Sequence, residues 1–238
     1  MEHLIIFHGF LYPTNKKYKP EHHHKPKEYE MNQIKIVDHP LIHHKMALIR
    51  QSSTSVKHFR ELTEEISIIL ACETTKNCKL KQIDVNTPLE NMVAQEILND
   101  IVLVVILRAG MGMLTGFLKI IPNAKIGYLG VYRNEQTLQP VEYYKKLPPN
   151  LSKANIFLLD PMLATGGSAV HSISILKEQG AQQVSLVCLI AAPEGVKYVN
   201  KKYPAVKMYT AALDRELNDV GYILPGLGDA GDRLTGTL

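Results

Sequence analysis

The chain has 238 residues, of which 45% are hydrophobic, so it is long enough to bury one large core without a second domain. No apolar run reaches the ~18 residues that a membrane-spanning helix needs, so a membrane protein is not expected. The formal net charge is +4 at pH 7, but the lysines are scattered and no basic run is interleaved with aromatic residues, so nucleic-acid binding is not expected either.

Residues 1–30 differ in composition from the rest of the chain, because they are rich in Lys, His, Tyr and Pro and show little apolar periodicity. We expect a disordered tail. The apolar run at residues 4–7 is short and follows Glu2, which is unlike a secretory signal, so we expect a cytoplasmic protein. We expect the three adjacent histidines of this segment to be solvated, because such histidines in a polar segment are more often solvated than metal-bound; they are His22, His23 and His24. The three cysteines lack paired spacing and indicate neither a disulfide framework nor a zinc site.

Residues 40–75 show a helical pattern, in which apolar residues recur at steps of three and four, namely Phe59, Leu62, Ile66 and Ile69. The basic residues of this stretch are expected to be solvated helix charges, namely Arg50, Lys57 and Arg60. Residues 79–85 alternate like a strand, whereas residues 88–98 fit either a helix or a hairpin. The sequence therefore predicts a helical N-terminal segment, followed by a stretch of ambiguous structure.

Beyond residue 100 the pattern changes to short apolar runs typical of buried strands, at residues 101–107, 125–131, 156–159, 184–191 and 207–211. Helical patterns lie between some of them, at residues 113–121 and 168–179. Strands that alternate with helices predict an α/β fold with a central, mostly parallel sheet flanked by helices. Ligands in such sheets bind beyond the carboxyl ends of the strands, where Arg108, Arg133 and Asp160 fall.

The most informative segment connects a predicted strand to a predicted helix and consists of Asp160, Pro161, Met162, Leu163, Ala164, Thr165, Gly166, Gly167 and Ser168. Its glycines allow the backbone to approach an anion, and the helix start offers unpaired N–H groups. It lacks the lysine of G-x-x-x-x-G-K-[ST] and the pattern G-x-G-x-x-G, which disfavours nucleoside triphosphates and dinucleotides. Because Asp160 can accept hydrogen bonds from sugar hydroxyls, we predict a ribose 5-phosphate site. The alternative is an ordinary turn, in which Asp160 and Thr165 only cap the helix.

Three further segments contain an arginine or an aspartate: residues 106–112 with Arg108, residues 131–135 with Arg133, and residues 221–232 with Asp229, and the first and third of them also contain glycines. In order and spacing, these segments and the loop resemble the uracil phosphoribosyltransferases. The resemblance covers about residues 31–238. In phosphoribosyltransferases generally, the ribose carboxylate belongs to an adjacent acidic pair. Here Pro161 follows Asp160, which points to the uracil branch.

The resemblance implies a single phosphoribosyltransferase domain over residues 31–238, with a small strand flap in the ambiguous segment. It implies pyrimidine salvage, in which uracil and 5-phospho-α-D-ribose 1-diphosphate (phosphoribosyl diphosphate) give UMP and diphosphate. Mg²⁺ would arrive with the diphosphate and keep several waters, so no dedicated protein metal site is expected. A homodimer or larger homo-oligomer is also implied. Some family members are activated by GTP, and no residue here decides whether this chain is.

The resemblance also assigns roles to individual residues. Phosphoribosyl diphosphate would be bound by Arg108, Arg133, Asp229 and the loop from Asp160 to Ser168, and the catalytic residues would be Arg133, Asp160 and Asp229. Uracil would be bound by Ile223, Gly228, Asp229 and Ala230. Physically, an arginine fork suits the growing negative charge of a leaving diphosphate. Backbone groups near glycines can read the donors and acceptors of uracil.

Two other classes of function stay open. The first is a transferase for a purine or for orotate, and the C-terminal segment argues against orotate because it lacks an added cation for the orotate carboxylate. The second is a regulator that retains the fold, senses nucleotides and binds RNA. The presence of Arg108, Arg133 and Asp229, together with the lack of a basic patch, argues against this class.

Overall fold

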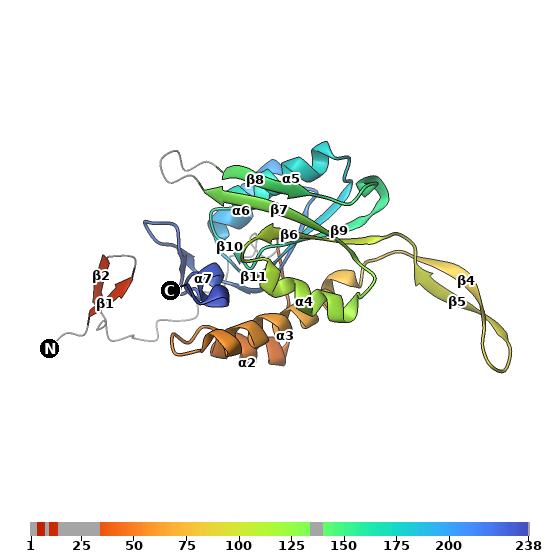
Figure 1. Cartoon of the computed structure of the whole chain (residues 1–238), viewed down its shortest axis with the longest axis horizontal. Helices are drawn as coiled ribbons and strands as arrows, with labels where there is room; N and C mark the ends of the chain where they lie inside the picture. Colours follow the sequence, from red (N-terminus) through yellow and green to blue (C-terminus); the bar gives the residue numbers. More distant parts are fainter. Residues whose placement is uncertain (1–3, 8–9, 14–33, 134–139, 238) are drawn as a thin grey trace.

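The computed structural model describes residues 4–7, 10–13, 34–133 and 140–237. In this part of the chain, the main element is an eight-stranded sheet. Its strands lie in the order β3 (Lys35–Ile36), β12 (Lys207–Leu213), β11 (Gln183–Ala191), β9 (Asn155–Leu159), β6 (Ile101–Leu107), β7 (Lys125–Arg133) and β8 (Pro140–Lys146), while β10 (Met162–Leu163) pairs with β11 off this path. All pairings in the sheet are parallel except that of β7 with β8, so the predicted mostly parallel sheet is confirmed (Figure 1).

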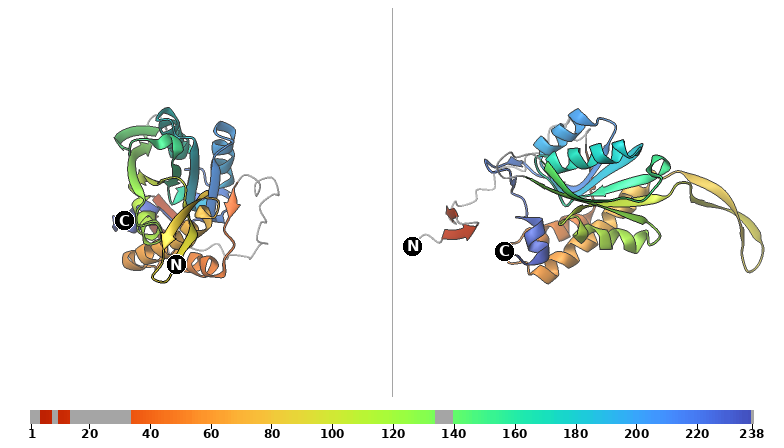
Figure 2. Two further views of the ribbon diagram at one scale, coloured as in Figure 1. Left: turned by 90° about the vertical axis from the view of Figure 1, so that its right-hand side faces the viewer. Right: turned by 45° about the horizontal axis from the view of Figure 1, so that its top comes forward.

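Helices cover both faces of this sheet (Figure 2). One face packs against α2 (Pro40–Ile49), α3 (Val56–Thr75), α4 (Met111–Ile120) and α7 (Ala230–Thr235). The other face packs against α5 (Gly167–Glu178) and α6 (Pro193–Lys202). This is the flanked sheet that alternating strands and helices predict.

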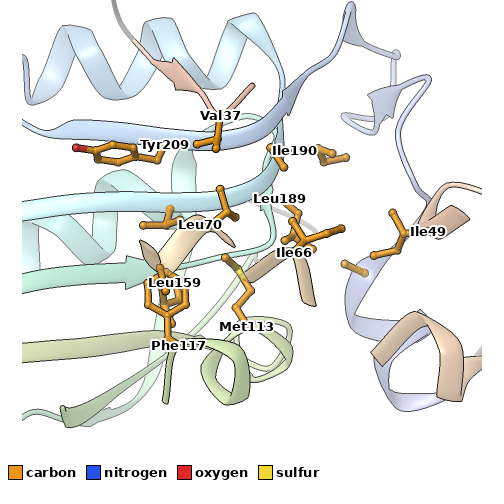
Figure 3. Close-up of a cluster of buried hydrophobic side chains, with 14 of the residues drawn as sticks. Val37, Ile49, Ile66, Leu70, Met113, Phe117, Leu159, Leu189, Ile190 and Tyr209 are labelled. Atoms are coloured by element: carbon orange, nitrogen blue, oxygen red, sulfur yellow. The ribbon is translucent and has the colours of Figure 1, made fainter. Parts of the chain in front are cut away.

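The central strands are buried on both faces, which explains their continuous apolar runs. In β6, Leu103 and Val105 belong to the cluster with α3 and α4, whereas Val102 and Val104 belong to the cluster with α5 and α6. Figure 3 shows the first cluster, in which side chains from α3 and α4 meet side chains of β9, β11 and β12. The carboxyl ends of these strands are therefore fixed by a packed core.

The helical stretch predicted over residues 40–75 is two helices, because a turn at residues 50–55 separates α2 from α3. Ser55 caps α3, since its side chain accepts a backbone N–H at 3.3 Å. Among the four apolar residues predicted to share one helix face, three are buried and Ile69 is half-buried, because Leu70 takes the next buried position.

The ambiguous segment before residue 100 is a hairpin of β4 (Leu80–Asn86) and β5 (Asn91–Ile97), which extends away from the body of the molecule (Figure 1). The Thr87 side chain closes its turn, because Oγ1 accepts from the N–H of Glu90 at 3.0 Å and donates to the carbonyl of Glu90 at 2.7 Å. A hydroxyl residue in this role is typical of tight turns. The strand flap that the resemblance implies is confirmed.

The sequence pattern does not predict β3, β8, α6 or α7. Strands β1 (Leu4–Phe7) and β2 (Phe10–Pro13) pair with each other in the N-terminal segment, while most of residues 1–33 lie outside the described part of the chain, so the disordered tail stays a prediction. Among the described helices, none has the length and apolar character needed to cross a membrane.

Candidate active site

Two strand ends define the centre of the candidate site. Strand β6 ends at Leu107, directly before Arg108, and β9 ends at Leu159, directly before Asp160. The two strands are parallel neighbours, with Val105 opposite Leu159. After β6 the chain forms β7 on one side of β6, and it then forms β9 and β11 on the other side. The direction in which strands are added to the sheet therefore reverses between β6 and β9. Open α/β sheets bind ligands at such a switch point.

The turn after β6 packs directly on the end of β9. A Cβ atom on Gly110 would lie 2.5 Å from the carbonyl oxygen of Leu159, so no larger residue fits there. The Arg108 side chain is 65% exposed, and its Nη2 lies 3.9 Å from Oδ1 of Asp232. An exposed ion pair at this distance is weak, so the guanidinium can exchange it for a bound anion. Arg108 therefore extends from a buried strand into solvent beside Asp160.

The predicted phosphate loop runs from β9 to the start of α5. Met162 and Leu163 pair with β11, and Gly166 adopts a φ of +81° directly before α5. The distance of 3.5 Å from the N–H of Gly167 to Oγ1 of Thr165 is too long for a good helix cap, so Thr165 does not act as one. The N–H groups in the first turn of α5 are thus available to an anion.

Gly195 in α6 supports this loop, a role that the sequence pattern does not predict. A Cβ atom on Gly195 would lie 2.3 Å from the carbonyl oxygen of Ala164, and one on Gly166 would lie 3.0 Å from the carbonyl oxygen of Gly195. The loop and α6 therefore touch backbone to backbone. The signal in the sequence is a glycine in the first turn of a helix, where alanine would be favoured by propensity.

Asp160 is partly buried, and its N–H donates to the carbonyl of Val187 at 3.1 Å. Burial raises the pKa of its carboxyl group to about 7, while the backbone N–H of Met162 acts in the opposite direction. On the neighbouring strand, burial and the nearby charge of Asp160 raise the pKa of the Cys188 thiol to about 12, against the hydrogen bond from Thr210. Cys188 thus stays protonated and is a poor nucleophile, whereas Asp160 can change its charge near neutral pH.

The C-terminal segment lies beside the Arg108 turn. Asp229 caps α7, because its Oδ1 accepts from the N–H of Asp232 at 2.9 Å. A Cβ atom on Gly231 would lie 3.1 Å from Oδ1 of Asp229 and 3.8 Å from Cβ of Ala109. The turn after Arg108 therefore lies against two other segments, the end of β9 directly before Asp160 and the C-terminal segment that contains Asp229.

The residues predicted to bind uracil differ in their exposure. Ile223 and Ala230 are buried, with exposed fractions of 7% and 0%. Gly228 is exposed and has a φ of +79°. Among these three positions, a base would therefore reach the main chain most readily at Gly228, and the uracil-binding roles of Ile223 and Ala230 stay predictions.

Arg50 contacts this segment, so the expectation that it is a solvated helix charge is wrong. Its guanidinium donates to both carboxylate oxygens of Asp214, at 2.8 and 2.5 Å, and to the carbonyl of Gly226 at 2.7 Å. The reason is its place at the C-cap of α2, where the chain turns toward the sheet edge. The feature of the sequence that could have identified Asp214 is its position shortly after the predicted buried strand at residues 207–211.

Two further arginines bind backbone near the C-terminus. Arg60 is exposed, as expected for a solvated helix charge, and its Nε also donates to the carbonyl of Leu234 at 2.6 Å. Arg233 is buried, lies 4.4 Å from the ring centroid of Phe59, and donates to the carbonyls of Ile49, Gln51 and Leu227. Burial lowers the pKa of Arg233. Lys57 is exposed beside Glu61, as expected.

The role predicted for Arg133 stays a prediction. Its backbone ends β7 opposite Pro140, but its side chain lies outside the described residues, as do residues 134–139 and His22 to His24. Among the side chains that the structure describes, no group of three or more His, Cys, Asp or Glu could hold a metal ion.

The chain resembles known proteins over most of its length. The family model for uracil phosphoribosyltransferase matches residues 36–237. A uracil phosphoribosyltransferase of Streptococcus equi subsp. zooepidemicus (strain MGCS10565) is 50% identical over 208 residues, which cover 87% of this chain and 100% of that protein. One from Bacillus cereus (strain B4264) is 51% identical with the same coverage.

A solved structure also matches closely. The AQ2163 protein from Aquifex aeolicus superposes with a TM-score of 0.81 at 41% identity, and the match covers 84% of this chain and 97% of that one. The family model and the relatives thus agree with the motifs and with the geometry of the sheet edge. This chain belongs to the uracil phosphoribosyltransferase family.

Proposed function

We propose that this protein transfers the 5-phosphoribosyl group of phosphoribosyl diphosphate to uracil, which gives UMP and diphosphate. The observation that supports the proposal is that the turn after Arg108 lies against the end of β9, directly before Asp160, and against the segment that contains Asp229. In this reaction N1 of uracil displaces diphosphate at C1′, and no covalent enzyme intermediate is needed. Most of the acceleration then comes from positioning two substrates and stabilising the leaving group.

The loop from Asp160 to Ser168 is the proposed site for the ribose 5-phosphate. The uncapped start of α5 provides backbone N–H groups for the phosphate, and the hydroxyls of Thr165 and Ser168 add donors. Asp160 at the start of the loop would accept hydrogen bonds from the ribose hydroxyls. Its ionised form also stabilises positive charge at the ribosyl centre as the bond to diphosphate breaks.

Arg108 and Arg133 are the proposed diphosphate-binding residues. Arg108 is suited to this role because its exposed guanidinium offers several donors and has only a weak ion pair to give up. Asp229 would contact phosphoribosyl diphosphate from the other side, next to the uracil-binding backbone.

Mg²⁺ fits this site as a companion of the diphosphate. Asp160 and Asp229 supply carboxylate oxygens from two segments, and no larger ligand group occurs among the described residues. Mg²⁺ is commonly held by one or two carboxylates together with substrate phosphates and waters. When bound, it would neutralise charge on the diphosphate.

The proposed base site discriminates by backbone hydrogen bonds. Cytosine has an amino group where uracil has a carbonyl, so a fixed backbone donor would lose its partner, at a cost of about 1–3 kcal/mol. Ile223, Gly228 and Ala230 would provide such main-chain groups in the proposed site, and their side chains add no charge.

Release of diphosphate tests the proposal. We expect release only when uracil and phosphoribosyl diphosphate are both present, and little release by an Asp229→Asn variant. Release without uracil, or none with both substrates, would contradict the proposal. Added GTP tests activation in the same assay, because an activated enzyme would release diphosphate faster at fixed substrate concentrations.

We further propose that residues 31–238 are the catalytic domain and that the protein is a homodimer or larger homo-oligomer. Deletion of residues 1–30 should then change the kinetic constants by less than about twofold, as for changes remote from a site. Light scattering of the same variant measures the assembly, and a monomer would contradict the second part.

A further inference from the structure

Arg50, Asp214 and Gly226 form a closed hydrogen-bonded ring. Arg50 donates to both oxygens of the Asp214 carboxylate and to the carbonyl of Gly226. Asp214 Oδ2 in turn accepts from the N–H of Gly226 at 2.9 Å. Both main-chain polar groups of Gly226 are thus held by one ion pair.

This ring is shielded from water. The side chains of Arg50 and Asp214 are 24% and 5% exposed, and Gly226 is buried. A bidentate arginine–carboxylate pair in such surroundings has a defined geometry, since water competes little for its hydrogen bonds. Asp214 is fixed further, because its N–H donates to the carbonyl of Ala191 at the end of β11. The ring therefore ties Gly226 to the sheet.

The chain around Gly226 is a tight turn that sets the direction of its neighbours. Gly226 has a φ of +68°, and a Cβ atom there would lie 2.1 Å from the carbonyl oxygen of Ile223. The next residue is also anchored, because Arg233 donates to the carbonyl of Leu227 at 2.7 Å. The segment between Ile223 and Gly228 is thus held at two successive residues by arginine side chains.

We propose that Arg50 and Asp214 are positioning residues for base recognition, which fix the main chain that reads uracil without touching the base. The inference rests on the proposed function, because it assumes that Ile223 and Gly228 flank the base. Donors and acceptors that are held rigidly reject a base with the wrong pattern, whereas mobile ones adapt to it. Loss of the ring should therefore weaken uracil binding and relax discrimination against cytosine, while phosphoribosyl diphosphate binds as before.

Steady-state kinetics of Arg50→Ala and Asp214→Asn test this inference. We expect the KM for uracil to rise about tenfold and the preference for uracil over cytosine to fall by a similar factor, as for loss of a charge-assisted hydrogen bond. The KM for phosphoribosyl diphosphate should stay within about twofold. Arg50→Lys keeps the charge but cannot form the fork, so it should have an intermediate KM for uracil. It provides the same test if Arg50→Ala does not fold.

Arg60→Ala is the matched control, because Arg60 also donates to a C-terminal carbonyl but contacts Leu234 beyond the uracil segment. It should lower the melting temperature without changing the KM for uracil. A rise in the KM for both substrates, or equal effects of the Arg50 and Arg60 variants, would overturn the inference alone. Absence of UMP formation by the unsubstituted protein would overturn the proposed function and the inference with it.

Discussion

The two halves of the candidate site are built in different ways. The ribose-phosphate half, with Arg108 and Asp160, directly follows buried strands of the central sheet. The base half has little regular structure, namely the two-residue strands β13 (Glu216–Leu217) and β14 (Ile223–Leu224) and the six-residue helix α7. Its backbone is held by Arg50 and Arg233, which bind carbonyl groups along it.

This difference predicts how substitutions affect each half of the site. A change in the ribose-phosphate half removes a donor or a charge but leaves the sheet and its core in place. A change in the base half alters the path of the backbone itself, because short elements have few contacts of their own. Substitutions in the two halves should therefore affect different substrates.

Asp229→Asn tests the junction of the two halves and should have the largest effect. Asparagine caps helices about as well as aspartate, so the hydrogen bond to the N–H of Asp232 is kept and the melting temperature should change little. Turnover should fall at least about a hundredfold, because a negative charge beside the substrates is lost. UMP formation and thermal denaturation measure the two effects, and turnover close to that of the unsubstituted protein would exclude a catalytic role for Asp229.

Arg108→Ala tests the ribose-phosphate half alone. We expect kcat/KM for phosphoribosyl diphosphate to fall about 10- to 100-fold, since a charge-assisted donor to the leaving group is lost. The KM for uracil should be unchanged, and so should the melting temperature, because the ion pair with Asp232 is exposed and long. Equal losses for both substrates would show that the two halves are not separable.

Gly226→Ala tests the base half, with Gly180→Ala as its control. Both glycines have positive φ, +68° and +84°. A Cβ atom on Gly180 meets nothing within 4 Å, whereas one on Gly226 would lie 2.1 Å from the carbonyl oxygen of Ile223. Gly180→Ala should cost about 1–2 kcal/mol of stability with unchanged kinetics. Gly226→Ala should also raise the KM for uracil about tenfold, and identical kinetics in both variants would show that the turn does not shape the base site.

The charge of Asp160 should make the activity depend on pH, with a smaller effect than the substitutions above. With a pKa of about 7, this carboxyl group loses its charge as the pH falls through neutrality. We expect kcat/KM for phosphoribosyl diphosphate to fall on the acid side of pH 7, and Asp160→Asn to flatten this limb at a lower rate. An unchanged acid limb in Asp160→Asn would assign it to another group.

The same shift predicts a change in stability. Folding raises the pKa of the Asp160 carboxyl group from 3.8 to about 7, so the folded state binds this proton more tightly than the unfolded state does. The resulting stabilisation is full below a pH of about 4 and is lost as the pH rises to about 7. Denaturant titrations should therefore show Asp160→Asn gaining stability over the unsubstituted protein between pH 5 and pH 8, and no gain would contradict the raised pKa.

The sequence predicts the strands that carry the ribose-phosphate half, because their signals are local. Buried strands read as continuous apolar runs, and Arg108 and Asp160 directly follow two of them. In the hairpin before residue 100, the second strand is ambiguous in the sequence because it has no buried face to impose a period of two. Leu89 at its tip is 96% exposed, so its apolar character carries no information on the fold.

The family resemblance assigns the base half to the glycine-rich C-terminal segment, but it does not indicate the residues that hold this segment in place. Arg50 and Asp214 are 164 positions apart, and nothing in the local pattern around either residue indicates the other. Arg233 is similar, since its partners at Ile49 and Gln51 are distant in the sequence. A buried arginine has the same local sequence signature as a solvated one, so long-range polar contacts need the fold before they can be seen.

The most direct test of the proposed transfer to uracil is the formation of UMP. Labelled uracil, phosphoribosyl diphosphate and Mg²⁺ would be incubated with the protein, and cytosine, hypoxanthine and orotate would be offered in parallel reactions. We predict that UMP forms from uracil and that the other three bases give no nucleotide. Nucleotide formation from hypoxanthine or orotate, or no product with any base, would contradict the claim.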